Sequence, residues 1–118
     1  MPNRLTHILG EYLKVKGVTA VAIVGRDGFV IDSSSNAEVD MDALGAIVAT
    51  AVGTVESLGK EFNLGTMNQY LSEFANGKVV MATVLDDILA VFTDNTAVIG
   101  GVRHAIKRHM PETIQALQ

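Results

Sequence analysis

The segment 43–55 contains no ionisable side chain, although Asp42 and Glu56 flank it directly. We expect a helix over residues 40–62, because one set of apolar residues recurs there in alternating steps of three and four. This set comprises Met41, Leu44, Val48, Ala51, Val55, Leu58 and Phe62. Such a stripe predicts that one side of the helix packs against the rest of the chain.

The opposite side of this helix also lacks charge. It consists of Ala43, Ala46, Ala49, Thr50, Gly53 and Ser57. A side that faced water would normally carry Lys and Glu, and a helix without charge all round is usually buried all round. Because a chain of 118 residues has little protein left to cover this second side, a second subunit is the natural cover. We therefore predict that a second copy of this chain covers this side of the helix.

The composition supports an interface and excludes several classes of site. Hydrophobic residues make up 48% of the chain and charged residues only 19%, below the usual quarter. The net charge of −4 disfavours a general nucleic-acid binder, which needs a basic surface. The sequence contains no cysteine, which excludes disulfides, thiolate zinc sites and cysteine nucleophiles.

We expect residues 1–118 to form a single domain in the cytoplasm. The longest uncharged run has thirteen residues, too few to span a bilayer, so we expect no membrane insertion. The N-terminal segment 1–17 includes Glu11 and lacks the apolar centre of a signal peptide.

The remaining pattern predicts two further helices and five strands. A first helix capped by Asn3 ends before Gly17, and strands follow over 18–24 and 29–32, joined by the turn 25–28. Residues 33–36 are polar and predict a connection, after which Asp40 caps the long helix.

Three strands are then expected over 66–75, 78–85 and 88–93. Asn76 and Gly77 predict a tight hairpin turn with positive φ at both residues. A last helix should be capped by Asp94 or Asn95, with Pro111 either kinking it or opening a short final turn. The order is α-β-β-α-β-β-β-α, an α+β fold.

No catalytic, cofactor or metal site is predicted, and we expect the protein not to be an enzyme. The segment 53–61 resembles a phosphate-binding loop, but it is one residue too long and Glu61 stands where Ser or Thr is required. His104 and His109 are five apart, so they do not share a helix face. Asp86 and Asp87 are interpreted as turn residues.

Arg103, Lys107 and Arg108 make the last helix basic. We interpret them as residues near its C-terminal end, where cations interact favourably with the helix dipole. A patch that binds an acidic partner is the alternative interpretation.

Three stretches together resemble the Roadblock/dynein light chain family, including its prokaryotic members such as the gliding-motility GTPase activator. They are GVTAVAIVGRDGFVIDS at 17–33, LGAIVATAVGTVESLGKEF at 44–62 and LAVFTDNTAVIGGVRHAIK at 89–107. Each stretch alone is weak, but their order and spacing make the match specific.

The resemblance implies a roadblock/profilin-like fold. In this fold a five-stranded antiparallel sheet carries the long helix on one face and the terminal helices on the other. Members of the family commonly dimerise by pairing their third strands edge to edge and packing the long helices across the two-fold axis. On this chain the resemblance implies a joining edge that comprises Met67, Asn68, Gln69, Tyr70 and Leu71. It implies a helix contact that comprises Ala46, Ala49, Thr50 and Gly53, on the side of the helix that the missing charges had already indicated.

The functional implication of the resemblance is a homodimeric, non-enzymatic regulator that binds a small Ras-like GTPase and modulates its nucleotide cycle or localisation. An adaptor or scaffold subunit for a motor or signalling complex, without nucleotide sensing, is the alternative. A small-molecule sensor is a third, because helix-covered sheets can hold ligands between their layers.

Overall fold

The computed structural model describes residues 4–118, so the predicted cap at Asn3 lies outside the described residues. The elements are α1 (Arg4–Tyr12), β1 (Val18–Val24), β2 (Val30–Ser35), α2 (Met41–Glu61), β3 (Gln69–Phe74), β4 (Gly77–Val84), β5 (Asp87–Thr93) and α3 (Ile99–Leu117). The predicted order α-β-β-α-β-β-β-α is confirmed.

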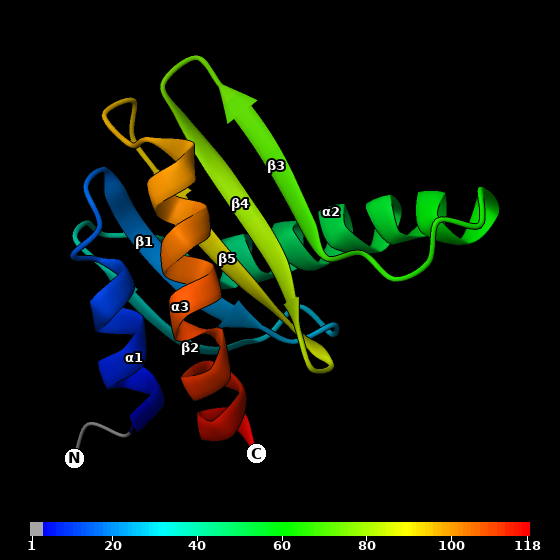
Figure 1. Cartoon of the computed structure of the whole chain (residues 1–118), viewed down its shortest axis with the longest axis horizontal. Helices are drawn as coiled ribbons and strands as arrows, with labels where there is room; N and C mark the ends of the chain where they lie inside the picture. Colours follow the sequence, from blue (N-terminus) through cyan, green and yellow to red (C-terminus); the bar gives the residue numbers. More distant parts are fainter. Residues whose placement is uncertain (1–3) are drawn as a thin grey trace.

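The five strands form one antiparallel sheet in the order β2-β1-β5-β4-β3, which leaves β2 and β3 at its edges. Helices α1 and α3 lie side by side on one face of the sheet, and α2 crosses the other face (Figure 1). The α+β class, and the separation of the long helix from the terminal helices, are therefore as predicted.

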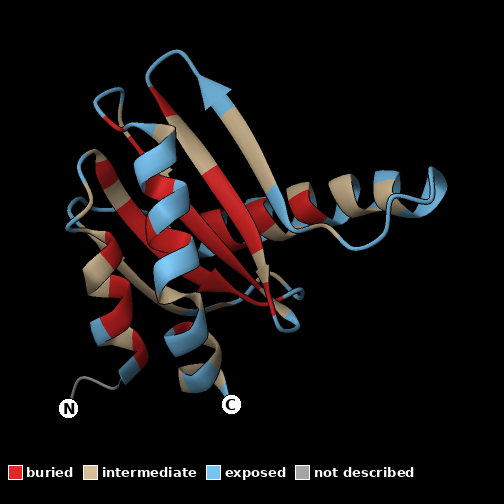
Figure 2. Ribbon diagram, viewed as in Figure 1, coloured by how far each residue is buried: buried red, intermediate tan, exposed pale blue. Residues whose placement is uncertain are grey.

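Each face of the sheet contributes to its own hydrophobic core. Val21 and Ile23 of β1 pack beneath α1 and α3, whereas Ala22 and Val24 pack beneath α2. This alternation follows from the two-residue period of a strand. The buried residues lie mainly along the central strands and on the inner sides of the helices (Figure 2). The side of α1 that faces the sheet is buried at Leu5, Ile8, Leu9 and Tyr12.

The cap predicted for the long helix is confirmed. The Asp40 carboxylate accepts a hydrogen bond from the backbone N–H of Ala43 at 3.1 Å, and Asp42 lies in the first turn of α2. Both carboxylates are close to the positive end of the helix dipole, but only Asp40 satisfies a free N–H group.

We expect Asp40→Ala to lower the free energy of unfolding by about 1 kcal/mol, because an N–H group at the start of α2 loses its partner. Urea denaturation measures this loss. Asp42→Ala is the matched control, since it removes a carboxylate from the same turn without removing a cap, and its effect should be smaller. Equal losses in the two variants would contradict the capping role.

The strand β2 is longer than predicted, because Ser33, Ser34 and Ser35 are part of it rather than of a polar connection. They pair with Ala22, Val21 and Ala20 of β1. Backbone hydrogen bonds define this strand, and a partly exposed edge position tolerates serine side chains.

The hairpin between β3 and β4 is present, but the predicted turn is wrong. Phe74 pairs with Gly77, so Ala75 and Asn76 form the turn, and neither Asn76 nor Gly77 has a positive φ. Gly77 is required for a different reason, since a Cβ atom there would overlap the carbonyl oxygen of Thr93 in β5.

The next turn also differs in position. Leu85 and Asp86 form it, with Leu85 at φ 55°, whereas Asp87 pairs with Val84 and belongs to β5. Burial, and then the neighbouring Asp86 carboxylate, raise the pKa of Asp87 above its usual value.

The predicted cap of the last helix is wrong as well. Val98 is the N-cap residue of α3 and makes no side-chain capping bond. The Asp94 carboxylate instead accepts hydrogen bonds from the N–H and hydroxyl of Thr96, at 2.8 and 2.6 Å, within the preceding turn. Pro111 lies inside α3, which continues to Leu117, so it does not open a separate final turn.

The interpretation of the basic residues of α3 is also wrong. Because the helix continues to Leu117, Arg103, Lys107 and Arg108 lie in its middle, and its last turn has no basic residue. The dipole acts only within the terminal turns of a helix and therefore does not explain these charges.

Candidate protein–protein interface

The small-residue side of α2 faces solvent in the isolated protomer. Ala43, Ala46, Thr50, Gly53 and Ser57 are exposed, and Ala49 is half-buried. A Cβ atom built on Gly53 would meet no heavy atom within 4 Å, so the space beside this residue is open.

This side of α2 is also less polar than its hydroxyl groups suggest. The hydroxyls of Thr50, Thr54 and Ser57 donate to carbonyl oxygens four residues earlier, at 2.8, 2.9 and 3.1 Å. Because these donors are satisfied within the helix, burial against another surface would not leave them unpaired.

The predicted apolar stripe of α2 is buried only in its first half. Leu44 and Val48 pack on the sheet together with Val52, whereas Leu58 and Phe62 are 54% and 66% exposed. The helix of 21 residues is about 30 Å long. The outer strands of a five-stranded sheet lie only about 20 Å apart. A helix that crosses such a sheet must therefore extend beyond it.

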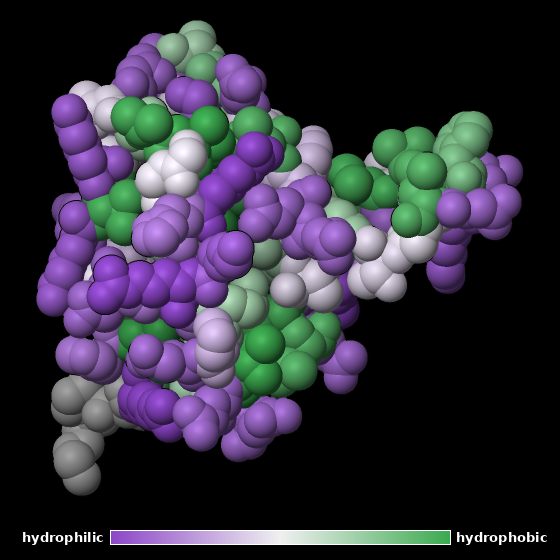
Figure 3. Space-filling view, viewed as in Figure 1, coloured by the Kyte–Doolittle hydropathy of each residue, from purple (hydrophilic) through white to green (hydrophobic). Residues whose placement is uncertain are grey.

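Figure 1 shows α2 passing beneath β3 and continuing past the edge of the sheet, and Figure 3 shows hydrophobic side chains gathered on this protruding end. By length and composition alone, α2 meets the criterion for a membrane-spanning helix, contrary to the expectation from its uncharged run. However, Leu44, Gly45, Val48 and Val52 are buried against the sheet.

Three further exposed apolar residues were not predicted as part of an interface. Ile47 on α2, Leu64 after it and Phe74 on β3 are 67%, 74% and 63% exposed. Together with Leu58, Phe62 and the exposed small residues of α2, they form what we call the α2–β3 surface. Exposed apolar patches mark protein–protein contact sites.

A groove of about 470 Å³ between α2 and the strands β3, β4 and β5 adjoins this surface. Its lining is mostly apolar and consists of Val39, Asp40, Leu44, Ile47, Val48, Ala51, Tyr70, Ser72, Phe74, Val79, Met81 and Phe92. Helix and strand residues thus border one continuous depression, which an apolar element of another chain could fill.

The five residues predicted for the joining edge are contiguous at the edge strand. Gln69, Tyr70 and Leu71 pair with β4 on one side, and within residues 4–118 no strand pairs with β3 on the other. Met67 and Asn68 precede β3, and their carbonyl oxygens accept from the hydroxyl and N–H of Thr83 at 2.6 and 3.1 Å. The open edge of β3 therefore offers backbone groups for pairing.

The protruding end of α2 is held in place by a few specific contacts. Glu56 forms an ion pair with Arg26 in the β1–β2 turn, and the Arg26 Nε atom donates to the carbonyl oxygen of Asp86 at 3.1 Å. The N–H of Leu64 donates to the carbonyl oxygen of Gly59 at 2.8 Å. These contacts join the second half of α2 to the β1–β2 turn and to the segment that follows the helix.

The residues considered for a phosphate loop or a metal site do not form one within residues 4–118. The segment 53–61 is helical within α2, so its N–H groups do not converge as in a phosphate loop. Within the part of the chain that the structure describes, no three His, Asp or Glu side chains are placed to hold a metal ion.

The family model described as the Roadblock/LC7 domain matches residues 5–93. This chain belongs to the Roadblock/LC7 family. Its curated relatives include an uncharacterised protein of Methanocaldococcus jannaschii, 34% identical over 96% of this chain and 98% of that protein.

Solved structures share the Roadblock fold at lower identity. MglB of Myxococcus xanthus is 22% identical, with a TM-score of 0.90 over 97% of this chain and 87% of that chain. The gliding protein MglB of Thermus thermophilus is 19% identical, with a TM-score of 0.87 over 96% and 87% of the two chains. An MglB with a tetrameric arrangement has a TM-score of 0.88 at 19% identity, over the same shares. At these identities the likeness shows the Roadblock fold alone.

Proposed function

We propose that this Roadblock protein is a homodimeric, non-enzymatic regulator that binds a small Ras-like GTPase and modulates its nucleotide cycle or localisation. The observation that carries the proposal is the exposed α2–β3 surface, which is apolar, grooved and adjacent to an open strand edge. Family membership supports a regulatory role, and the tetrameric arrangement of an MglB supports self-association within this fold.

In the proposed dimer a two-fold axis relates two β3 strands that pair edge to edge. Met67, Asn68, Gln69, Tyr70 and Leu71 supply the edge, and Ala46, Ala49, Thr50 and Gly53 supply the helix contact. The protruding end of each α2 then lies over the partner's sheet, where its apolar side chains cover the partner's groove. The contact is the same on both copies, so the assembly closes and leaves no β3 edge exposed.

The proposed mechanism requires no catalytic side chain from this protein. Binding beside the mobile loops of a GTPase favours one of their arrangements, and this can change the rate of hydrolysis or of nucleotide release. Lys60 is the only basic residue in α2, so this helix supplies no arginine to the GTPase site.

Nucleotide-dependent capture from the native host tests this function. We expect a small GTPase to bind the immobilised protein more strongly with a slowly hydrolysed GTP analogue than with GDP, because the two nucleotides hold the mobile loops differently. The purified pair should then show an altered rate of GTP hydrolysis or nucleotide release. Equal capture in both states with unaltered rates would contradict regulation and favour the adaptor function.

A further inference from the structure

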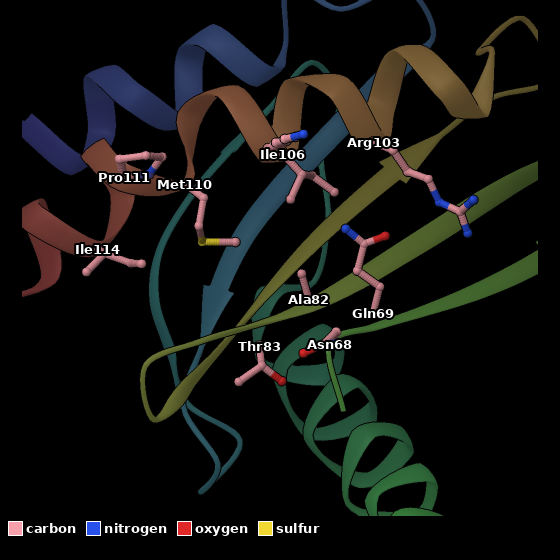
Figure 4. A pocket seen from close by; sticks show the side chains of 10 residues that line it. Asn68, Gln69, Ala82, Thr83, Arg103, Ile106, Met110, Pro111 and Ile114 are labelled. Atoms are coloured by element: carbon pink, nitrogen blue, oxygen red, sulfur yellow. The ribbon is translucent and has the colours of Figure 1, made fainter. Parts of the chain in front are cut away.

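A second groove, of about 700 Å³, lies on the opposite face of the sheet between α3 and the strands β3 and β4. Its lining residues are Asn68, Gln69, Ala82, Thr83, Arg103, Ile106, Lys107, Met110, Pro111 and Ile114. Figure 4 shows Met110 pointing from α3 toward the strands and Gln69 pointing from β3 back toward α3. The groove exists because α3 does not extend over the β3 edge of the sheet and because the side chain of Ala82 in β4 is small.

The floor and the rim of this groove differ in chemistry. Ile106, Met110 and Ile114 recur every four residues, so they form one apolar row along α3. Arg103 and Lys107 are also four residues apart and form a parallel row of positive charge beside it. Across the groove, Asn68 and Gln69 offer amide groups.

Arg103 and Lys107 form no ion pair within the part of the chain that the structure describes. Among residues 4–118, the ion pairs are His7–Glu11, Lys14–Glu11 and Arg26–Glu56, and none involves α3. Like charges four residues apart on a helix repel one another, and the middle of a helix offers no compensation from the dipole. The arrangement of Arg103 and Lys107 therefore costs stability in the isolated protein and would be relieved by an anionic group.

We propose that this groove binds an acidic amphipathic segment of a partner protein. Carboxylates of the segment pair with Arg103 and Lys107, and its apolar side chains pack on Ile106 and Met110. An extended segment fits the site better than a small molecule, because the groove is open along one side and the charges and apolar residues run in parallel rows.

This proposal goes beyond the regulatory function and does not depend on the dimer, because the groove is complete within one protomer. It is also compatible with pairing at β3. A dimer would use the backbone edge of that strand, whereas the side chain of Gln69 lies in the groove on the α3 face of the sheet. Occupation of the groove and self-association are therefore separable.

A random linear peptide library panned on the purified full-length protein tests the proposal. We expect enriched peptides to combine acidic and apolar residues, and to shift the amide resonances of Ala82, Thr83 and Ile106. The double variant Arg103→Glu/Lys107→Glu should weaken binding of these peptides by about tenfold or more, because attraction becomes repulsion. Added salt should weaken binding to the unmodified protein as well.

Arg108→Glu is the matched control. It reverses a charge on the same helix, but Arg108 lines the cleft between α1 and α3 instead of the groove. Peptide affinity should change by no more than about twofold in this variant. Enriched peptides without acidic residues, an absence of peptides that bind the groove, or equal losses in the two variants would overturn the proposal. Light scattering should give the same oligomeric state for the unmodified protein, the double variant and Arg108→Glu. A failure of the peptide-binding proposal can therefore be distinguished from a failure of the dimer proposal.

Discussion

In the proposed dimer, Gly53→Leu is expected to separate the two copies into monomers. The leucine side chain would occupy the space that the second α2 needs for close approach, and the two-fold axis would place it in the contact twice. Overpacking of a close contact costs about 1–3 kcal/mol, so two copies should raise the dissociation constant by about thirtyfold or more. Light scattering over a dilution series measures this change.

The folded protomer itself should tolerate Gly53→Leu. A Cβ atom at this position meets no neighbour, and leucine favours a helix more than glycine does by about 1 kcal/mol. Gly100→Leu is the matched control, because Gly100 is an equally open glycine at the start of α3. That variant should remain dimeric. Unchanged assembly of Gly53→Leu, or a monomer in the unmodified protein, would contradict the proposed contact.

Gly45→Ala is expected to destabilise the fold strongly, although it changes the same helix by a single methyl group. Gly45 is buried where α2 crosses the β1–β2 turn, and a Cβ atom there would overlap the carbonyl oxygen of Gly28. Backbone atoms cannot yield as a flexible side chain does. We expect a loss of about 3 kcal/mol, or a melting temperature lower by about 10 °C.

Gly100→Ala provides the comparison for this second prediction. It introduces the same methyl group into a helix where nothing lies within 4 Å, so the melting temperature should not fall. Calorimetry at one protein concentration measures both variants. If Gly45→Ala were as stable as Gly100→Ala, the close packing of α2 on the β1–β2 turn would be refuted.

The sequence predicted the elements well where a periodic apolar pattern coincided with burial. The strand at 18–24 has the predicted bounds, and the helix predicted at 40–62 extends from Met41 to Glu61. Such patterns are reliable because burial requires apolar residues at the spacing that each element imposes. Features that depend on backbone contacts were missed, such as the approach of Gly77 to Thr93.

The errors about the interface and about the charges of α3 concern features that the spacing of apolar residues does not record, namely where a helix ends and how far it extends past the sheet. The pattern identified the apolar side of α2, but it did not reveal that Leu58 and Phe62 extend past the sheet. Comparing the helix length with the sheet width would have shown this. The charges of α3 were misplaced because Pro111 was expected to lie near the helix end, whereas the helix continues for six more residues to Leu117. The predicted interface residues stay a prediction.

The protruding end of α2 has a consequence for how the protein responds to its own abundance. Within one protomer few side chains cover the turns around Leu58, so their local stability is low. Association would add contacts there by mass action, as a bound ligand does. Amide protons in these turns should therefore exchange more slowly in concentrated than in dilute samples. The concentration of the protein would then determine how rigid the protruding end of α2 is.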